Sequence, residues 1–300
     1  MLRFKDRLWI ASLLLLAAPA MRAAAVPVEL TYKPCDGMIC LPVMLADGKT
    51  HWLLLDTGNV NSWLLADTAR AMHLKLDVIE QGGTKLSGIF RLGAQTVFLQ
   101  KQPLSNRFLA FEKKQVGELP TGVEGALAYT FFTGRVLQID FPHHTLSVLD
   151  APANGLTASA APIHLITFGK AGPPVVVGSG FSVNSRPVNA QIDTCYTGTL
   201  LVYDRAIADL GLQDAPAAGP PKFFPNTDGG VNMKEAAIDS IGFGGRVLSA
   251  RPAKVYFPAP GKKFVHQPDG LFEGTVGNAL FAHSVVVLDL QSMKIDVRPG

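Results

Sequence analysis

The stretch HWLLLDTGNVNSW, residues 51–63, places an aspartate, Asp56, at the end of an apolar run and follows it with Thr-Gly. The stretch VNAQIDTCYTGTLL, residues 188–201, places Asp193 in the same setting 137 positions later, followed by Thr-Cys. A single Asp-Thr after an apolar run is most simply a turn residue, because short motifs recur by chance. Two such motifs in equivalent settings predict two halves of one site.

The similarity extends well beyond the two motifs. Residues 38–57 and 175–194 each consist of an apolar strand, a polar turn and a second strand that ends in Asp-Thr. With an offset of 149, residues 124–148 match residues 273–297, from a shared Glu-Gly to a closing strand. The same order of elements, found twice, predicts two homologous lobes.

A stretch rich in Ala, Pro, Gly and Ser, residues 151–162, separates the two copies. We therefore predict an N-terminal lobe over residues 26–155 and a C-terminal lobe over residues 156–300. Alternating apolar residues and valine-rich runs such as VVVLDL are typical of strands, with only short helices between them. The predicted class is all-β.

Residues 1–25 have the pattern of a secretory signal peptide: a basic start, a short apolar run and an Ala-x-Ala site before Val26. We expect a periplasmic or secreted protein with no stable membrane span after cleavage; an uncleaved anchor is the alternative. These residues hold four of the 27 basic and one of the 24 acidic residues, which leaves 23 of each. This balance argues against a nucleic-acid partner.

Three cysteines are present: Cys35, Cys40 and Cys195. In an oxidising compartment Cys35 and Cys40 could close a small loop as a disulfide; two unpaired strand residues are the alternative. Cys195 is then a free thiol beside the second Asp-Thr, either a redox-sensitive residue or a small buried one. No Cys/His spacing indicates a metal site, and we expect no cofactor.

Two related lobes can bring Asp56 and Asp193 face to face. Two carboxylates in a small, partly dry space do not both ionise easily, so they share a proton and titrate as a pair; aspartic-protease dyads are the general example. The ionised member can deprotonate a water molecule while the protonated member polarises a carbonyl group. Peptide hydrolysis needs this acid and this base.

Each half resembles a retropepsin-type unit, and the pair resembles the bilobal, pepsin-like arrangement of bacterial periplasmic aspartyl proteases. The resemblance is carried by LDTG (55–58) and IDTC (192–195), supported by GALA (125–128) and GTVG (274–277). It covers nearly all of residues 30–297. It implies an acid-protease fold of two β-barrel-like lobes, a peptide or protein substrate, and a monomer, because one chain carries both halves of the site.

The resemblance also implies roles for single residues. Asp56 and Asp193 would form the catalytic dyad. Thr57 and Thr194 would join the two active-site loops through their hydroxyls, and Gly58 would let its backbone N–H approach the carboxylate.

The family also has a β-hairpin flap that closes over the substrate and excludes water. The glycine pairs Gly82-Gly83 and Gly229-Gly230 fall where a flap is expected in each copy. Ordinary surface turns explain these glycines equally well.

The second motif departs from the family because Cys195 stands where a glycine is expected. If this position needs a positive φ, the side chain costs about 1–2 kcal/mol; if it does not, the Cys195 N–H can still serve the carboxylate. Asn59 and Tyr196 replace small residues; we expect Asn59 to substitute and Tyr196 to turn away.

We predict an aspartic endopeptidase. One alternative is a weak or inactive relative that binds peptides or envelope components in the same cleft. The other is a duplicated scaffold in which the Asp-Thr pairs are structural and the two aspartates lie far apart.

Overall fold

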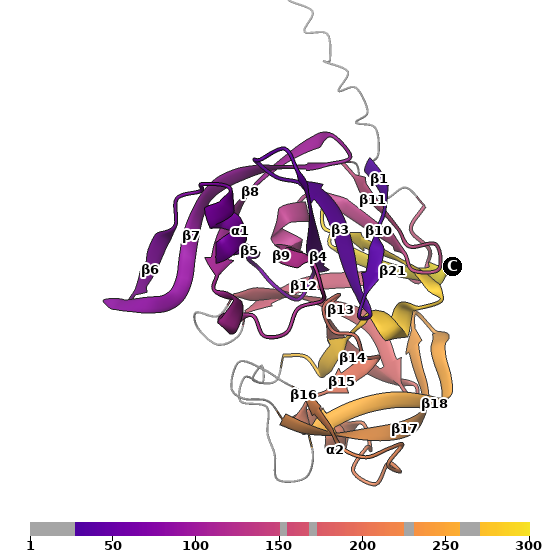
Figure 1. Cartoon of the computed structure of the whole chain (residues 1–300). Coiled ribbons are helices and arrows are strands. Elements are labelled where there is room, and N and C mark those ends of the chain that lie inside the picture. Colours follow the sequence, from indigo (N-terminus) through magenta and orange to yellow (C-terminus); the bar gives the residue numbers. More distant parts are fainter. Residues whose placement is uncertain (1–27, 151–154, 168–172, 225–230, 259–270) are drawn as a thin grey trace, which may run out of the picture.

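The computed structural model describes residues 28–150, 155–167, 173–224, 231–258 and 271–300. The predicted signal peptide lies outside these residues, and so do Gly229 and Gly230 of the second predicted flap. Strands joined by tight turns make up most of the described chain, as Figure 1 shows. The predicted all-β class is confirmed.

The strands of the described residues form two sheets. The smaller sheet has, in spatial order, the eight strands β2 (Lys33–Cys35), β3 (Met38–Met44), β4 (Thr50–Asp56), β9 (Val123–Ala128), β5 (Ser62–Leu65), β8 (Gln102–Phe111), β7 (Thr84–Leu99) and β6 (Asp77–Gln81). The larger sheet has the thirteen strands β1 (Val28–Thr31), β11 (Thr145–Leu149), β10 (Val136–Asp140), β20 (Ser284–Asp289), β21 (Lys294–Pro299), β12 (Ala161–Thr167), β13 (Pro174–Val183), β14 (Arg186–Ile192), β19 (Gly274–Val276), β15 (Leu200–Val202), β18 (Arg246–Pro258), β17 (Val231–Phe243) and β16 (Lys222–Phe224).

The two halves of the chain repeat one strand order. The order β2-β3-β4-β9-β5-β8-β7-β6 reappears as β12-β13-β14-β19-β15-β18-β17-β16 inside the larger sheet. The parallel pairs also correspond, since β4–β9 and β5–β8 match β14–β19 and β15–β18. The repeat read from the sequence is therefore a repeat of topology.

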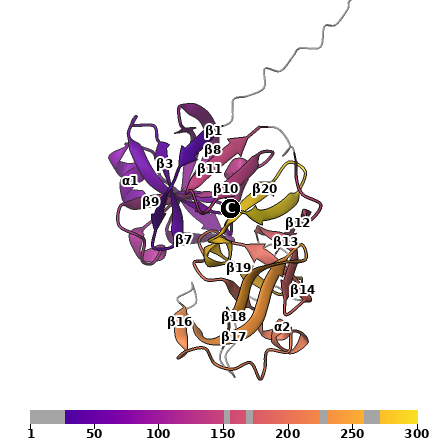
Figure 2. The same cartoon turned by 90° about the vertical axis from the view of Figure 1, so that its right-hand side faces the viewer.

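The other strands of the larger sheet join the halves, with β10 beside β20 (Figure 2). In this antiparallel pair Gln138 lies opposite Val287, and the sequence offset of 149 relates the same two residues. Two equivalent residues that face each other lie on a twofold axis, so β10 and β20 meet at the pseudo-twofold axis of the molecule. Because this sheet runs through both halves, the boundary between residues 155 and 156 stays a prediction.

Apolar side chains from both halves pack into one continuous core. Phe141 of the N-terminal half lies 5.8 Å from Phe281 of the C-terminal half, measured between ring centroids, and Phe181 lies 6.3 Å from the same ring. Burying one large apolar side chain contributes about 1.5–3 kcal/mol to folding. The contact between the lobes is therefore part of the hydrophobic core, and it sets how their loops meet.

The helices are short. They are α1 (Ala66–Ala71), α2 (Asp204–Asp209) and the 3-10 helices η1 (Lys113–Gln115), η2 (Tyr129–Phe132) and η3 (Asn278–Phe281). In the described part of the chain, no helix has the length and apolar character needed to cross a membrane. Helices η2 and η3 occupy equivalent places, directly after β9 and just after β19.

The hairpin of β6 and β7 projects from the N-terminal half (Figure 1). Gln81 pairs with Thr84, so Gly82 and Gly83 form a two-residue turn with φ values of +59° and +79°. Positive φ at both central residues is typical of a type I′ turn, which glycine adopts without strain. The first predicted flap pair is therefore the tip of a projecting hairpin.

Candidate active site

Both candidate aspartates lie at the ends of equivalent strands. Strand β4 ends at Asp56, and strand β14 ends at Ile192, directly before Asp193. The backbone N–H of Asp193 donates to the carbonyl of Val276 at the end of β19 (3.1 Å). Each aspartate is thus held between a parallel strand pair and a loop that leaves the sheet.

Gly125 in strand β9 and Gly274 at the start of strand β19 are needed for close packing beside these loops. A Cβ at Gly125 would lie 2.2 Å from the carbonyl oxygen of Trp63, and one at Gly274 would lie 2.1 Å from that of Leu201. Real side chains do not approach a backbone so closely. Both supporting segments of the sequence motif therefore begin with a glycine for a steric reason.

The two loops are joined by a reciprocal exchange of hydrogen bonds between the threonines. The N–H of Thr57 donates to Oγ1 of Thr194, and the N–H of Thr194 donates to Oγ1 of Thr57, both over 3.1 Å. The two hydroxyls donate onward to the carbonyls of Ile192 (2.8 Å) and Leu55 (2.5 Å). Because both threonines are buried, this exchange fixes one loop against the other.

The exchange brings the two aspartates together. A carboxylate oxygen of Asp56, one of Asp193 and Sγ of Cys195 all lie within 4.8 Å of one another. Oδ1 of Asp56 accepts from the Gly58 N–H (3.1 Å), and Oδ1 of Asp193 accepts from the Cys195 N–H (2.8 Å). The alternative in which the aspartates lie far apart is therefore wrong.

Gly58 is required by its contact with the opposite carboxylate. A Cβ on Gly58 would lie 2.4 Å from Cγ of Asp193. Its φ is not positive, so the requirement comes from close approach and not from an unusual backbone conformation.

We expect Gly58→Ala to separate the two carboxylates. Overpacking at a close contact costs about 1–3 kcal/mol of unfolding free energy, and a displacement of about 1 Å can lower turnover by about 10²-fold. Gly93→Ala is the matched control, because a Cβ there meets nothing within 4 Å. Peptide cleavage and urea unfolding of the two variants measure both effects; an active, stable Gly58→Ala protein would contradict the prediction.

Cys195 occupies the equivalent position in the second loop without backbone strain. Its φ does not lie in the positive range, so its conformation carries no penalty for a side chain. Its Sγ donates to the carbonyl of Leu55 (3.6 Å) and packs against an apolar cluster of the opposite lobe that includes Leu54 and Trp63. The second loop therefore tolerates a side chain, and its N–H still serves Asp193.

Burial and mutual repulsion shape the protonation of the site. The pKa of Asp56 is raised, mainly because the carboxyl is removed from water and secondly because the charge of Asp193 is close. Hydrogen bonds from N–H groups of Gly58 and Asn59 partly oppose this rise. Burial likewise raises the pKa of Asp193. Burial and the two nearby carboxylates raise the pKa of the Cys195 thiol well above its usual value. Cys195 is half-buried. Because the thiolate is the reactive form of cysteine, the raised pKa of this thiol argues against a redox sensor.

The raised pKa values predict how stability depends on pH. A carboxyl with a raised folded-state pKa adds stability that is fully present below the unfolded-state pKa and lost as the pH rises through the folded-state pKa. Each unit of the rise corresponds to about 1.4 kcal/mol. Since asparagine mimics a protonated carboxyl, Asp56→Asn should match the wild type in unfolding free energy at pH 3 and exceed it increasingly above about pH 4. Urea unfolding from pH 3 to 8 measures this; a constant difference would contradict it.

Tyr196 follows Cys195 and points into its own lobe. Its ring packs against the cluster of Met233 and Tyr256. It therefore leaves the position beside Asp193 to backbone groups.

Two further residues support the loops, and the sequence did not single them out. Nε2 of Gln191 donates to the carbonyl of Gly58 (3.1 Å), and Nδ2 of Asn278 donates to that of Thr194 (2.7 Å). Asn278 directly follows the GTVG segment, and this position next to a motif is the sequence signal that could have identified it. Gln191 lies on a strand whose pattern does not distinguish it.

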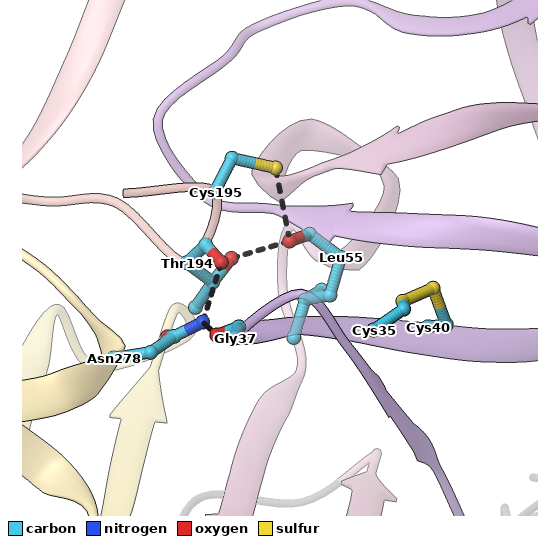
Figure 3. Close-up of a disulfide and its surroundings, with 7 residues drawn as sticks. All are labelled: Cys35, Gly37, Cys40, Leu55, Thr194, Cys195 and Asn278. Atoms are coloured by element: carbon cyan, nitrogen blue, oxygen red, sulfur yellow. Dashed lines mark hydrogen bonds between the residues drawn. A yellow bond between two sulfur atoms is a disulfide. The ribbon is translucent and has the colours of Figure 1, made fainter. Parts of the chain in front are cut away.

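The cysteine pairing left open by the sequence is resolved. Cys35 and Cys40 form a disulfide with a Cα–Cα distance of 6.1 Å, and it closes the turn between β2 and β3 (Figure 3). Cys195 is a free thiol.

Comparisons with known proteins identify the fold. The chain matches no protein-family model, and it matches no curated protein. Among solved structures it resembles the aspartic proteinase from Irpex lacteus, with a TM-score of 0.56 and 14% identity over 91% of this chain and 97% of that one. Basic 7S globulin from soybean aligns with a TM-score of 0.47 and 12% identity, over 91% and 94% of the two chains. The first match shows the bilobal pepsin-like fold.

Proposed function

We propose that this protein is an aspartic endopeptidase and that Asp56 and Asp193 form its catalytic dyad. The observation that carries the proposal is the reciprocal exchange between Thr57 and Thr194. It holds a carboxylate from each lobe within 4.8 Å of the other. Both aspartates are half-buried, and two mutually repelling acids held side by side in a partly exposed position are typical of a catalytic site.

The chemistry follows from one shared proton. The ionised aspartate takes a proton from a water molecule, whose oxygen attacks the scissile carbonyl, while the protonated aspartate donates a hydrogen bond to the carbonyl oxygen. Collapse of the tetrahedral intermediate breaks the C–N bond, and the amine leaves with a proton from the dyad. A carboxylic acid and an amine are the products, and the dyad regains its starting proton.

The proposal extends to substrate and location. A peptide or protein chain would lie between the lobes, with the β6–β7 hairpin as a flap whose Gly82-Gly83 tip bends without strain. The protein would act as a monomer in the periplasm or outside the cell, as the mature chain 26–300. The disulfide between Cys35 and Cys40 supports an oxidising compartment.

The direct test is cleavage of an unfolded-protein pool by residues 26–300 between pH 3 and pH 8. New N-termini, identified by mass spectrometry, would support the proposal. A folded protein that cleaves nothing at any pH would refute it.

A specific observation favours a second candidate, a peptide-binding relative with little turnover. Sγ of Cys195 lies within 4.8 Å of carboxylate oxygens of both aspartates, whereas a glycine at this position would place no side chain beside them.

The second candidate predicts that Cys195→Gly gains turnover while peptide affinity stays. The added glycine costs about 0.5–1 kcal/mol of stability through backbone entropy. Cleavage and peptide binding by both proteins measure this. A wild type as active as Cys195→Gly would rule out the blocking role.

A further inference from the structure

We propose that Asn278 is a positioning residue that fixes the second active-site loop to the disulfide-closed turn of the opposite lobe. Figure 3 shows this turn, Asn278 and the loop together. The proposal rests on the catalytic role proposed for Asp56 and Asp193, because positioning matters only if their geometry does.

The side-chain amide of Asn278 joins the two segments directly. Its Nδ2 donates to the carbonyl of Gly37 over 2.9 Å and to the carbonyl of Thr194 over 2.7 Å. The side chain is buried, with the residue 6% exposed. Its Oδ1 is buried as well and has no hydrogen-bond partner among the described residues. Leaving an acceptor unpaired costs free energy, and a flipped amide would set oxygen against two carbonyls. The orientation is therefore fixed by the two donated bonds.

The turn that receives one of these bonds is closed by the disulfide. Asp36 and Gly37 have φ values of +50° and +81° and form the two-residue connection between β2 and β3. The bond between Cys35 and Cys40 closes the same hairpin. A Cβ at Gly37 would lie 3.2 Å from Cβ of Thr197, so the turn also packs against the second active-site loop.

Asn278 completes the constraints on Thr194. The N–H of Thr194 donates to Thr57, and its hydroxyl donates to Leu55. The carbonyl accepts from Asn278. Every backbone and side-chain polar group of Thr194, the residue after Asp193, therefore has a hydrogen-bond partner. The partner of its carbonyl, Asn278, is also bonded to the turn that the disulfide closes.

The internal repeat supports a built contact. Tyr129 is the equivalent of Asn278 under the offset of 149, and Pro174 is the equivalent of Gly37 under the offset of 137. The Tyr129 hydroxyl donates to the carbonyl of Pro174 over 3.1 Å. The first residues of η2 and η3 therefore reach the opposite lobe at equivalent places. A phenol has one hydrogen to donate, whereas an amide has two, so Asn278 can also hold its own lobe's active-site loop.

The test removes each end of the connection separately and then both. Asn278→Leu keeps the approximate shape without donors, and Cys35→Ser with Cys40→Ser opens the turn. We expect each change to lower kcat by up to about 10²-fold, because small misplacements of catalytic groups are costly, and to leave KM nearly unchanged. Since both act through one connection, the combined variant should lose little more than Asn278→Leu alone. Asn184→Asp, at an exposed turn of the C-terminal lobe, is the control.

Hydrogen exchange gives a readout that needs no catalysis. Backbone amides of residues 193–197 should exchange faster in both variants, and in wild type treated with a dithiol, which reduces the disulfide with two electrons and two protons and is itself oxidised. Unchanged exchange overturns the proposal, and so do additive losses of kcat. If the wild type shows no turnover, but residues 193–197 still exchange faster in the variants and after reduction, the endopeptidase proposal is refuted. The positioning role of Asn278 is then supported. If Asn278→Leu does not fold, hydrogen exchange of the Cys35→Ser, Cys40→Ser variant and of the dithiol-treated wild type still tests the proposal.

Discussion

We expect Asp56→Asn and Asp193→Asn each to lower kcat/KM for peptide cleavage by about 10²–10⁴-fold. Each carboxylate accepts one backbone N–H and faces its partner across the lobe boundary. An amide can keep the accepted hydrogen bond, but it cannot take up or release the shared proton. The variants should therefore fold and bind substrate while losing the chemical step.

Asp67→Asn is the matched control, because this side chain is 81% exposed and lies on α1, outside the pair. It should cleave like the wild type. Initial rates on one defined peptide, identified from the pool, measure all three variants. Full activity of either dyad variant would refute a shared dyad.

Thr57→Val and Thr194→Val should cause the largest losses of stability. Valine has the shape of threonine but lacks the hydroxyl that both accepts from the partner loop and donates to a carbonyl. Thr57→Val removes the partner of the Thr194 N–H and of the Ile192 carbonyl. Thr194→Val removes the partner of the Thr57 N–H and leaves the Leu55 carbonyl only the weak bond from Sγ of Cys195. Each buried group left unpaired costs about 1–3 kcal/mol. We expect the free energy of unfolding to fall by at least about 2 kcal/mol and turnover to fall with it, because the exchange sets the distance between the aspartates.

Thr57→Ser and Thr194→Ser separate the hydroxyl from its methyl group. Serine keeps both hydrogen bonds and loses one buried methyl, so it should retain most of the activity and stability. Urea unfolding and peptide cleavage distinguish the two series. If serine and valine variants lost equal amounts, the hydroxyl exchange would not be the stabilising feature.

Much of the fold could be read from the sequence, because its signals are local or repeated. The strand-turn-strand unit that ends in Asp56 recurs before Asp193, and the structure shows the same strand order in both halves. The continuous sheet through β10 and β20 was not predicted. It depends on which strand edges meet across the pseudo-twofold axis, and no local pattern encodes this.

The candidate site could be predicted less completely. The motifs point to the aspartates and to the threonines beside them. They do not explain Gly58, whose need arises from a carboxylate of the other lobe. The sequence did not show whether Cys195 needs a positive φ, which would strain its backbone. In the structure its φ is not positive, so no such strain is present.

Strand periodicity and motif repetition are properties of neighbouring residues, so the sequence alone predicts the duplicated all-β organisation and the equivalence of the two Asp-Thr loops. The folded structure was needed to show that the two carboxylates meet, that Cys35 and Cys40 pair, and that Gln191 and Asn278 support the loops. The contacts of these two amides join residues 133 and 241 positions apart. Such pairs form only when the shared core packs the lobes together, so their partners are set by the geometry of the folded chain.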